Sequence, residues 1–282
     1  MILLRESNAL KNLIARTKNA GKTIGFVPTM GALHNGHLYL IKKSKQKCDV
    51  TVCTIFVNPT QFNNKNDFYK YPVTIENDIF QLEKADCDIL FFPSQNEMYP
   101  NGILPKTSYN FGEIENLLEG KYRPGHFQGV GQIVHKLIEL IAPDYLFVGQ
   151  KDFQQCIIIK KLIKLIGSST KLEIEETLRE PSGLAMSSRN LRLSETEKER
   201  ATAIFKALTF IKNNQQNKTV SELELYANEL LTSNGFDKID YISIVKANDL
   251  LPIKNIDSQI KTVALVAAFM GGVRLIDNML LN

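Results

Sequence analysis

The chain has 282 residues, of which 44% are hydrophobic and 23% are charged. These proportions are ordinary for globular proteins, and they exclude a disordered, collagen-like or coiled-coil chain. Lys and Arg number 34 against 30 Asp and Glu, so the formal net charge is +4. We therefore expect neither a nucleic-acid partner nor a membrane partner, although a local basic pocket for an anionic substrate remains possible.

The cysteines and the N-terminal segment bear on where the protein works. Four cysteines lie in or beside apolar runs, none of them in CxxC spacing: Cys48, Cys53, Cys87 and Cys156. This pattern is typical of buried free thiols in a reducing compartment. The first residues lack the apolar core of a secretory signal, and no apolar run reaches the roughly 18 residues of a membrane span. We therefore expect a soluble cytoplasmic protein.

Apolar runs alternate with helical patterns through the first part of the chain. A helix is expected from Ser7 to about Gly21, then a strand at TIGFVPT and a helix from about His37 to Lys47. The strands have nearly unbroken apolar runs, as strands buried on both faces do. This alternation predicts an α/β fold with a parallel sheet. Further along we expect strands over 49–57, 87–93, 144–149 and 171–178, and helices over 75–85, 126–141 and 153–167.

The pattern changes after about residue 178. Ser194 and Glu197 form a capping box that opens a polar-faced helix. Two helices followed by clustered strands predict a smaller α+β domain with an antiparallel sheet. We expect helices from Ser194 to about residue 213 and over 220–233, then strands over 238–246, 261–269 and 273–280. The expected domains are 1–178 and 179–282.

The segment PTMGALHNGHLYL (28–40) follows the TIGFVPT strand directly and opens a helix. Unpaired backbone N–H groups and the positive end of the helix dipole favour phosphate binding at such a junction. Gly31 and Gly36 let the backbone approach a ligand, and the HxGH pair His34 and His37 can donate hydrogen bonds to phosphate oxygens. Two alternatives remain open: both histidines are surface or capping residues, or they belong to a metal site.

Polar residues also follow the next strand of the predicted sheet. VNPTQF (57–62) ends a buried run. Because parallel strands place their ligands at one edge, Asn58 and Gln61 are expected in the same crevice as the HxGH turn. Their amides suit a substrate with hydroxyl, carbonyl and carboxylate groups. The alternative is a plain turn punctuated by Pro59.

Two further segments carry candidate anion-binding residues. GQKD (149–152) ends a strand and opens the next helix, and Lys151 there could reach a phosphate. Asp152, in the first helical turn, interacts favourably with the helix dipole and could accept a hydrogen bond from a ribose or an amide. A plain helix cap is the alternative. In GKYRPGHF, Arg123 could pair with a carboxylate.

The segment REPSGLAMSSRN (179–190) lies near the expected domain boundary. Its glycine and serines indicate a mobile polar loop that packs little and could close on a polyphosphate. Arg189 supplies a fork of donors, and Ser187 and Ser188 supply hydroxyl groups. A solvated linker is the alternative.

Together these motifs resemble the pantoate–β-alanine ligase family of the HxGH nucleotidylyltransferase superfamily. The resemblance runs from about residue 4 to 280 and rests on PTMGALHNGHL, FVNPTQF, GKYRPGHFQGV, FVGQKDFQQ, REPSGLAMSSRN and GGVRLIDN, in this order. It implies a Rossmann-like N-terminal domain, a small C-terminal lid and a cytoplasmic homodimer. It further implies that ATP, with Mg²⁺, activates pantoate as pantoyl adenylate, which β-alanine converts to pantothenate with release of AMP.

The resemblance also implies roles for individual residues. His37 is the implied catalytic histidine, with His34 beside it and Lys151 and Arg189 completing the charged set. The implied substrate-binding residues are Gln61 for pantoate and β-alanine, Gln155 for pantoate, and Asn58 and Arg123 near them. The implied ATP-binding residues are Met30, Gly31, Ala32, Leu33, His34, Asn35, Gly36, His37, Gly149, Gln150, Lys151, Asp152, Leu178, Met186, Ser187, Ser188 and Arg189.

The chain departs from the family pattern at three positions. Val73 stands where Arg is usual, and Ser182 where Asp is common. Asn77 replaces an acidic residue, which leaves Asp78 as the candidate for a water-mediated Mg²⁺ contact. Two other functions stay open: another HxGH-type nucleotidylyltransferase, which would need a second phosphate-binding cluster, and a non-catalytic ATP-binding module.

Overall fold

The computed structural model describes residues 1–103 and 107–282. The chain forms two compact units, each described by itself. The N-terminal unit consists of residues 1–149 and 155–176, and the C-terminal unit of residues 150–154 and 177–282. The short connection after residue 149 therefore belongs to the C-terminal unit, although the helix that follows it returns to the N-terminal one.

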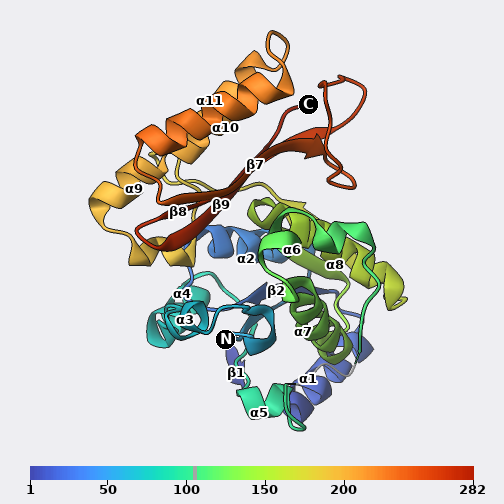
Figure 1. Ribbon diagram of the computed structural model, residues 1–282. Helices are drawn as coiled ribbons and strands as arrows, with labels where there is room; N and C mark the ends of the chain where they lie inside the picture. Colours follow the sequence, from blue (N-terminus) through green and yellow to red (C-terminus); the bar gives the residue numbers. More distant parts are fainter. Residues whose placement is uncertain (104–106) are drawn as a thin grey trace. The chain divides into compact units, whose positions relative to one another are not determined.

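The N-terminal unit, coloured from blue to yellow-green in Figure 1, is built on a six-stranded parallel sheet with the order β1-β4-β3-β2-β5-β6. Its strands are β1 (Ile2–Leu4), β2 (Ile24–Thr29), β3 (Val50–Ile55), β4 (Ile89–Phe91), β5 (Tyr145–Gly149) and β6 (Lys171–Glu175). The middle strands are buried on both faces, as their apolar runs predicted. This confirms the parallel α/β sheet.

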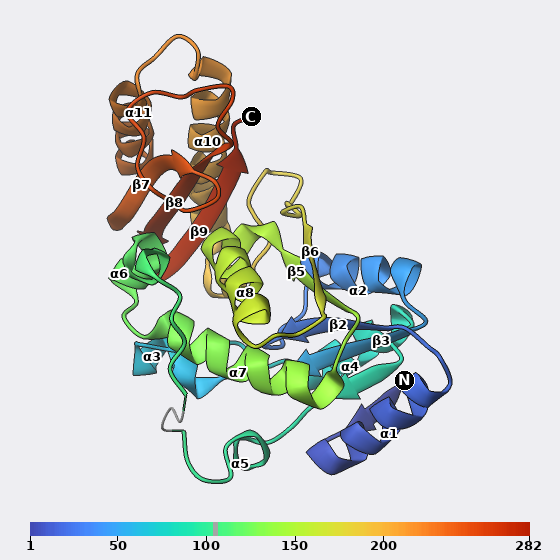
Figure 2. The ribbon, with the colours of Figure 1, turned by 90° about the vertical axis from the view of Figure 1, so that its right-hand side faces the viewer.

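Helices cover both faces of this sheet. The longer ones are α1 (Ser7–Asn19), α2 (Asn35–Lys47), α4 (Ile75–Lys84), α7 (His126–Ile141) and α8 (Phe153–Leu165). Figure 2 shows α2 on one side of the sheet and α7 and α8 on the other, as right-handed crossovers require. Shorter helices complete the unit: α3 (Lys65–Tyr69), α5 (Gln95–Met98), α6 (Leu118–Tyr122), and the 3₁₀ turns η1 (Pro59–Gln61) and η2 (Glu113–Asn116).

Two features at the N-terminus differ from the sequence prediction. Residues Ile2–Leu4 form the edge strand β1, which pairs with β4 in register Ile2↔Ile89. A run of three apolar residues carries too little periodicity to indicate a strand, and its partner lies far along the chain. Glu6 occupies the N-cap position of α1 without a side-chain cap hydrogen bond, and Ser7 already lies within the helix.

The C-terminal unit pairs three antiparallel strands with helices, as predicted. The sheet has the order β7-β8-β9, with β7 (Lys238–Lys246), β8 (Thr262–Met270) and β9 (Val273–Leu280). Its other elements are the 3₁₀ turns η3 (Gln150–Asp152) and η4 (Ser188–Arg192), and the helices α9 (Glu195–Ala201), α10 (Ala203–Asn214) and α11 (Val220–Ser233).

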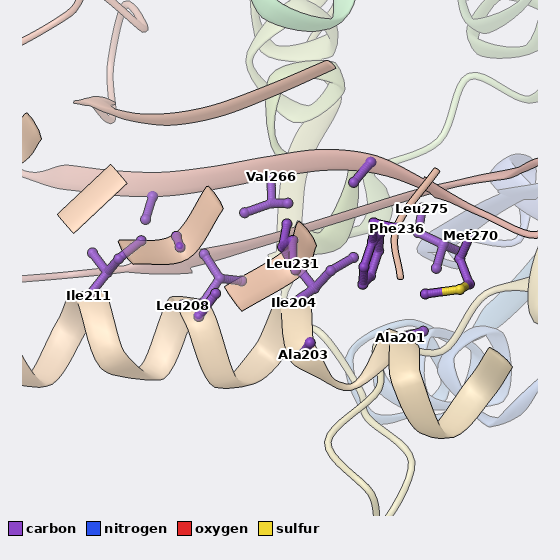
Figure 3. Close-up of a cluster of buried hydrophobic side chains, with 14 of the residues drawn as sticks. Ala201, Ala203, Ile204, Leu208, Ile211, Leu231, Phe236, Val266, Met270 and Leu275 are labelled. Atoms are coloured by element: carbon purple, nitrogen blue, oxygen red, sulfur yellow. The ribbon is translucent and has the colours of Figure 1, made fainter. Parts of the chain in front are cut away.

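The core of this unit lies between the sheet and the α10–α11 pair. Ile204, Leu208 and Ile211 share one side of α10, and Figure 3 shows them directed toward sheet residues such as Val266. Their spacing of three and four residues places them on one helical face. Burial of this face supplies most of the stability that such short helices cannot supply alone.

The helix predicted from Ser194 onward is two helices, α9 and α10, which meet at Thr202. The predicted capping box is confirmed, since Glu197 N donates to Ser194 Oγ at 3.3 Å and Ser194 N donates to Glu197 Oε2 at 2.7 Å. At the break, Thr202 Oγ1 donates to the carbonyl of Glu199 at 2.6 Å. A hydroxyl that competes for a backbone carbonyl favours such an interruption.

All four cysteines are buried free thiols, as predicted. Burial raises the pKa of the Cys48 thiol to about 11 and that of Cys87 to about 12. These two thiols therefore stay protonated near neutral pH.

Over the described residues, no helix combines the length and hydropathy that a membrane crossing needs.

Candidate active site

The turn between β2 and α2 holds the HxGH motif in a strained but well-anchored conformation. Gly31 and Ala32 both have positive φ, +83° and +49°. A Cβ on Gly31 would lie 3.0 Å from the Ile55 side chain and 3.1 Å from Asp78 Oδ2, so glycine is needed for both space and backbone angle. A left-handed Ala costs free energy, so the surrounding contacts must hold it.

Asp78 supplies those contacts from the first turn of α4. Its Oδ2 accepts the Ala32 N–H at 2.9 Å, and its Oδ1 accepts the Leu33 N–H at 2.8 Å. Thr74 Oγ1 donates to Oδ1 as well, at 3.0 Å. The carboxylate is 1% exposed. Charge-assisted bonds of this kind are about twice as strong as neutral ones, so Asp78 anchors the HxGH turn.

The two histidines of the motif cap the helix that they open. His34 is the N-cap of α2, and its Nδ1 accepts the Gly36 N–H at 3.1 Å. His37 Nδ1 accepts the His34 N–H at 3.3 Å. Backbone N–H groups can only donate, so both Nδ1 atoms are unprotonated acceptors in this geometry. Both rings are then neutral with their protons on Nε2.

This arrangement gives the turn two imidazole N–H donors. The ring centroids lie only 4.0 Å apart. Both rings are half-buried at the N-terminus of α2, where the helix dipole is positive. The capping interpretation of the histidines and the phosphate-binding interpretation are therefore compatible, because capping uses the Nδ1 atoms and the Nε2 atoms carry the protons.

Asn58 follows β3 and is buried, with an exposed fraction of 1%. Its Nδ2 donates to Gln61 Oε1 and to the carbonyl of Gly129, each at 3.2 Å. Its Oδ1 accepts from Tyr99 Oη at 2.7 Å and from Thr60 Oγ1 at 3.1 Å. These four bonds fill the hydrogen-bonding capacity of the amide. The structure thus shows Asn58 positioning the Gln61 side chain, and the expected substrate contact of Asn58 stays a prediction.

Gln61 lies in η1 and is fixed from both ends. Its side-chain Nε2 lies 3.1 Å from Met30 Sδ, beside the HxGH turn. Its carbonyl lies 2.8 Å from His126 Nδ1 and 3.5 Å from Arg123 Nη2. The N-terminal unit therefore brings Gln61 to the same strand-end edge as the HxGH turn, as the sequence predicted.

The Arg123 side chain contacts neighbouring residues of its own unit in this structure. Its Nη1 lies 3.4 Å from Glu119 Oε2, one turn earlier, and 3.2 Å from His126 Nε2. Because the Gln61 carbonyl must accept, His126 carries its proton on Nδ1, and Nε2 accepts from Arg123. The predicted pairing of Arg123 with a carboxylate is met by Glu119 of the same chain.

Two remaining candidates of the N-terminal unit lie at the end of β5 and in α8. Gly149 ends the strand, and its carbonyl accepts from Cys156 Sγ at 3.4 Å. Gln155 lies in the first turn of α8 and is half-buried.

In the C-terminal unit, η3 carries Gln150, Lys151 and Asp152. Lys151 Nζ lies 3.8 Å from Asp152 Oδ2, a loose pair between neighbours. The main chain of this turn is held by β9, because Asn278 Nδ2 donates to the carbonyls of Gln150 and Lys151 at 3.0 and 2.9 Å.

The predicted polar loop over 179–190 is more tightly packed than its composition indicated. Met186 N donates to the Leu178 carbonyl at 3.0 Å, so a short hairpin forms. Gly183 has φ of +92°, and a Cβ there would lie 2.4 Å from the Phe205 ring. The expectation that this glycine packs little was wrong, since it marks a close approach and not a flexible linker.

The predicted nucleotide-binding residues at the end of this loop are also ordered. Ser187 caps η4 by accepting the Arg189 N–H at 3.3 Å, and Ser188 is buried. Asn190 Nδ2 donates to the Ala185 carbonyl at 3.0 Å.

The residues present do not fit a protein-held Mg²⁺. Within the described parts of the chain, no three His, Cys, Asp or Glu side chains converge as a metal cluster would. Both oxygens of Asp78, the expected contact, already accept hydrogen bonds from Ala32, Leu33 and Thr74, away from solvent. Mg²⁺ keeps several waters and usually binds through substrate phosphates, so a dry, committed carboxylate does not suit it.

Asp78, Tyr99 and His126 hold other residues of the candidate site in place, a role that the motifs did not reveal. They act on backbone atoms or amides far along the chain, for example 46 residues apart for Asp78 and Ala32. A single sequence carries no local signal for such pairs. The capping role of the histidines was the one support that the local spacing did suggest.

Comparisons with known proteins agree with this architecture. The family model described as pantoate-beta-alanine ligase matches residues 2–280. Pantothenate synthetases from Caldicellulosiruptor saccharolyticus and Cytophaga hutchinsonii are 40% and 41% identical, covering all of this chain and 100% and 99% of theirs.

Solved structures are similar over nearly the whole chain. The pantothenate synthetase of Thermus thermophilus has a TM-score of 0.91 and 34% identity, with 99% of each chain covered. The pantoate-beta-alanine ligase of Francisella tularensis, solved with beta-gamma ATP and beta-alanine, has a TM-score of 0.82 and 40% identity, covering 99% of this chain and 97% of that one. The full-length match and the shared fold show that this chain belongs to the pantoate–β-alanine ligase family.

Proposed function

We propose that this protein joins pantoate and β-alanine into pantothenate at the expense of ATP, with AMP and pyrophosphate as the other products. A pantoate carboxylate oxygen attacks the α-phosphorus of ATP, and pyrophosphate leaves. The β-alanine amine then attacks the carbonyl carbon of pantoyl adenylate and loses a proton as AMP departs. Family membership over residues 2–280 supports this assignment. The observation that carries it is the pair of histidines at the N-terminus of α2, whose Nδ1 atoms accept backbone N–H groups of the turn.

The HxGH turn is the proposed phosphate-binding element. Met30 to His37 would bind ATP, with the backbone N–H groups and the helix dipole attracting the phosphates. His37, with His34 beside it, would donate from Nε2 to oxygens whose negative charge rises as the α-phosphorus is attacked. Because Nδ1 is already used in capping, these donors are preorganised and need no reorientation during the reaction.

Residues of the C-terminal unit are proposed to complete ATP binding. Lys151 and Arg189 would offset the charge of two anions, ATP and pantoate, held together. Gln150, Asp152, Leu178 and Met186 to Ser188 are the other proposed ATP contacts of this unit, and Gly149 is one of the N-terminal unit. The roles of residues 1–178 as catalytic domain and 179–282 as lid are part of the same proposal.

Amides are proposed to recognise the other substrates. Gln61, positioned by Asn58 and His126, would contact pantoate and β-alanine, and Gln155 would contact pantoate. Arg123 would act through the Gln61 backbone, which it contacts at 3.5 Å. The Francisella relative was solved with beta-gamma ATP and beta-alanine, which supports the same substrate classes here.

Mg²⁺ is proposed to arrive with ATP, bound to its phosphates, where it supplies charge neutralisation. The chain's own residues orient the reacting groups and donate hydrogen bonds. We also propose that the protein is a cytoplasmic homodimer, as the resemblance implies. Sedimentation analysis at several concentrations tests the dimer: a mass of twice the chain supports it, and a monomer contradicts it.

A product assay tests the proposed function. Purified protein is given ATP, Mg²⁺, pantoate and β-alanine, and the products are separated by chromatography. We expect one pantothenate and one AMP per turnover, and neither product when pantoate is omitted. Formation of a nucleotidylated phosphate compound would instead favour another HxGH-type transferase, and ATP binding without turnover would favour a non-catalytic module.

A further inference from the structure

The last strand carries two adjacent polar residues that the proposed chemistry does not use. Asp277 and Asn278 lie in β9, within the motif GGVRLIDN, and both are buried in the C-terminal unit. Consecutive side chains of a strand point to opposite faces, so the two reach different neighbours. Buried polar side chains on an edge strand need partners, and these partners turn out to be the two proposed ATP-binding segments of this unit.

Asn278 reaches the turn that carries Lys151. Its Nδ2 donates to the carbonyl oxygens of Gln150 at 3.0 Å and Lys151 at 2.9 Å. In return, Gln150 Nε2 donates to Asn278 Oδ1 at 3.1 Å. The Asn278 residue is 2% exposed. The Asn278 amide therefore uses its two N–H donors and its oxygen acceptor on two consecutive residues, Gln150 and Lys151, which lie 128 and 127 positions away in sequence.

This contact explains why residues 150–154 belong to the C-terminal unit although β5 and α8 on either side belong to the N-terminal one. A turn tied only to its flanking elements would belong with them. With its carbonyls held by Asn278, the main chain of Lys151 is fixed relative to β9. The place that Lys151 Nζ can reach is then set by the C-terminal unit.

Asp277 reaches the second segment. Arg179 binds it through both nitrogens, Nη1 to Oδ2 at 2.6 Å and Nη2 to Oδ1 at 3.0 Å. Arg179 Nη1 also donates to the Gly183 carbonyl at 3.1 Å, and the guanidinium lies 4.3 Å from the centre of the Phe205 ring. A bidentate pair with these supports fixes the hairpin that leads to Met186–Arg189.

We propose that Asn278 is a positioning residue for the nucleotide: it fixes the Lys151 turn, while its neighbour Asp277 fixes the hairpin that leads to Arg189. One pair of adjacent residues thus sets the spacing of the two cationic segments. This inference rests on the proposed function, because it assumes that Lys151 and Arg189 meet ATP. It assigns to the chain's last strand a role in ATP affinity and not only in the fold of the unit.

Two variants and a matched control test the role. Asn278→Ala removes the three hydrogen bonds, and Asn278→Asp keeps the shape but turns an oxygen toward two carbonyls. The control is Gln215→Ala, which removes another amide of the same unit that donates to a backbone carbonyl, that of Leu281 at 3.0 Å. For each protein the full chain is assayed for KM of ATP, pantoate and β-alanine, for kcat, and for its unfolding temperature.

We expect both Asn278 variants to raise KM for ATP by roughly 10-fold or more, the scale of losing two or three net hydrogen bonds. KM for pantoate and β-alanine at saturating ATP should stay within about twofold, and Gln215→Ala should match the wild type. Three results would overturn the role: an unchanged KM for ATP, an equal rise in KM for all three substrates, or an Asn278→Asp variant whose KM for ATP matches that of the wild type. A wild type that makes no pantothenate would instead refute the proposed function.

Hydrogen exchange tests the anchor without any activity. The backbone amides of residues 150–155 are compared in the folded wild type, Asn278→Ala and Gln215→Ala. Exchange that is at least about 10-fold faster in Asn278→Ala alone supports the anchor, because opening of this turn no longer breaks those bonds. Equal exchange rates in all three proteins would overturn the proposed anchoring by Asn278, even if the enzyme assay shows no difference between them.

Discussion

The backbone N–H of His34 donates to Nδ1 of His37 at 3.3 Å, so the second histidine of the motif completes the cap that the first one begins. The same ring is the proposed catalytic donor through its other nitrogen. Helix capping and the proposed catalysis therefore involve the same imidazole, and a suitable substitution can separate them.

His37→Ala removes both contributions. We expect the single-turnover rate of pantoate adenylation to fall by roughly 10²–10³-fold, the scale of losing one preorganised donor to a transition state. Stability should fall by about 1 kcal/mol, because the alanine cannot complete the cap. Rapid-quench kinetics and denaturant unfolding measure the two effects. A rate within about threefold of the wild type would contradict the catalytic role.

His37→Gln is the matched variant. Gln is a favoured residue at the third helical position of a capping box, so it keeps an acceptor for the His34 N–H. We expect wild-type stability with a rate as low as that of the alanine variant. Recovery of the rate along with the stability would mean that His37 acts through the cap alone. The exposed Lys42→Ala, on the same helix, should change neither quantity.

Asp78→Asn tests the anchor of the HxGH turn. In the wild type, the carboxylate accepts hydrogen bonds from Ala32, Leu33 and Thr74. In the variant, the amide N–H₂ group must face at least one of these donors and cannot accept from it. We expect a loss of about 1–3 kcal/mol in the free energy of unfolding, since a buried backbone donor is left unsatisfied. The adenylation rate should fall as well.

The control is Glu76→Gln, an exposed carboxylate in the same helical turn, which should leave stability and rate unchanged. Unfolding is followed in denaturant and activity over a range of Mg²⁺ concentrations. Normal stability with a higher Mg²⁺ requirement in Asp78→Asn would contradict the anchor and support the metal contact that the sequence suggested.

Acid should weaken the C-terminal unit through its capping boxes. Hydrogen bonds from the N-caps Ser194 and Thr219 lower the pKa of Glu197 and Glu222 below the ordinary 4.5. Because the folded pKa lies below the unfolded one, this stabilisation is complete above the unfolded value and is lost as pH falls through the folded value. The unfolding temperature of the wild type should therefore fall as the pH is lowered across that window.

The double variant Glu197→Gln and Glu222→Gln keeps the caps without the titrating charge. Its unfolding temperature should fall less than that of the wild type between about pH 6 and about pH 3. Calorimetry at several pH values measures both. Identical acid slopes for the two proteins would show that these carboxylates do not contribute.

The cysteines should be unreactive toward thiol reagents in the folded protein. All four are buried, and burial raises the pKa of Cys48 to about 11 and that of Cys87 to about 12. The thiolate is the reactive form, so neither access nor ionisation favours reaction. Titration with an aromatic disulfide at neutral pH should give fewer than one thiol per chain before denaturation and four after it. Rapid reaction of a native thiol would contradict the burial.

The sequence predicted the fold best where structure depends on local pattern. The apolar run at β3 and the i, i+3, i+4 spacing in α7 were sufficient to place both elements. The HxGH spacing located the turn between β2 and α2 for the same reason, since a strand–glycine–helix junction is encoded locally. Predictions failed where a single residue pairs with a distant one.

Four residues illustrate that limit. The edge strand at Ile2 depends on pairing with β4, and Asp78 and Asn278 act on turns 46 and 128 residues away. Asn58 was expected to meet the substrate, yet its amide is filled by Tyr99, Thr60, Gln61 and Gly129. Whether an amide faces a ligand or the protein depends on tertiary packing, which one sequence does not display.

The most direct test of the proposed reaction follows one oxygen atom. Pantoate carrying ¹⁸O in its carboxylate is incubated with the enzyme, ATP, Mg²⁺ and β-alanine, and the nucleotide products are examined by mass spectrometry. If the carboxylate attacks the α-phosphorus, one labelled oxygen becomes the bridge and leaves with AMP. We therefore predict one ¹⁸O in AMP and none in pyrophosphate. Label in inorganic phosphate, with ADP as the nucleotide product, would show an acyl phosphate and contradict the account.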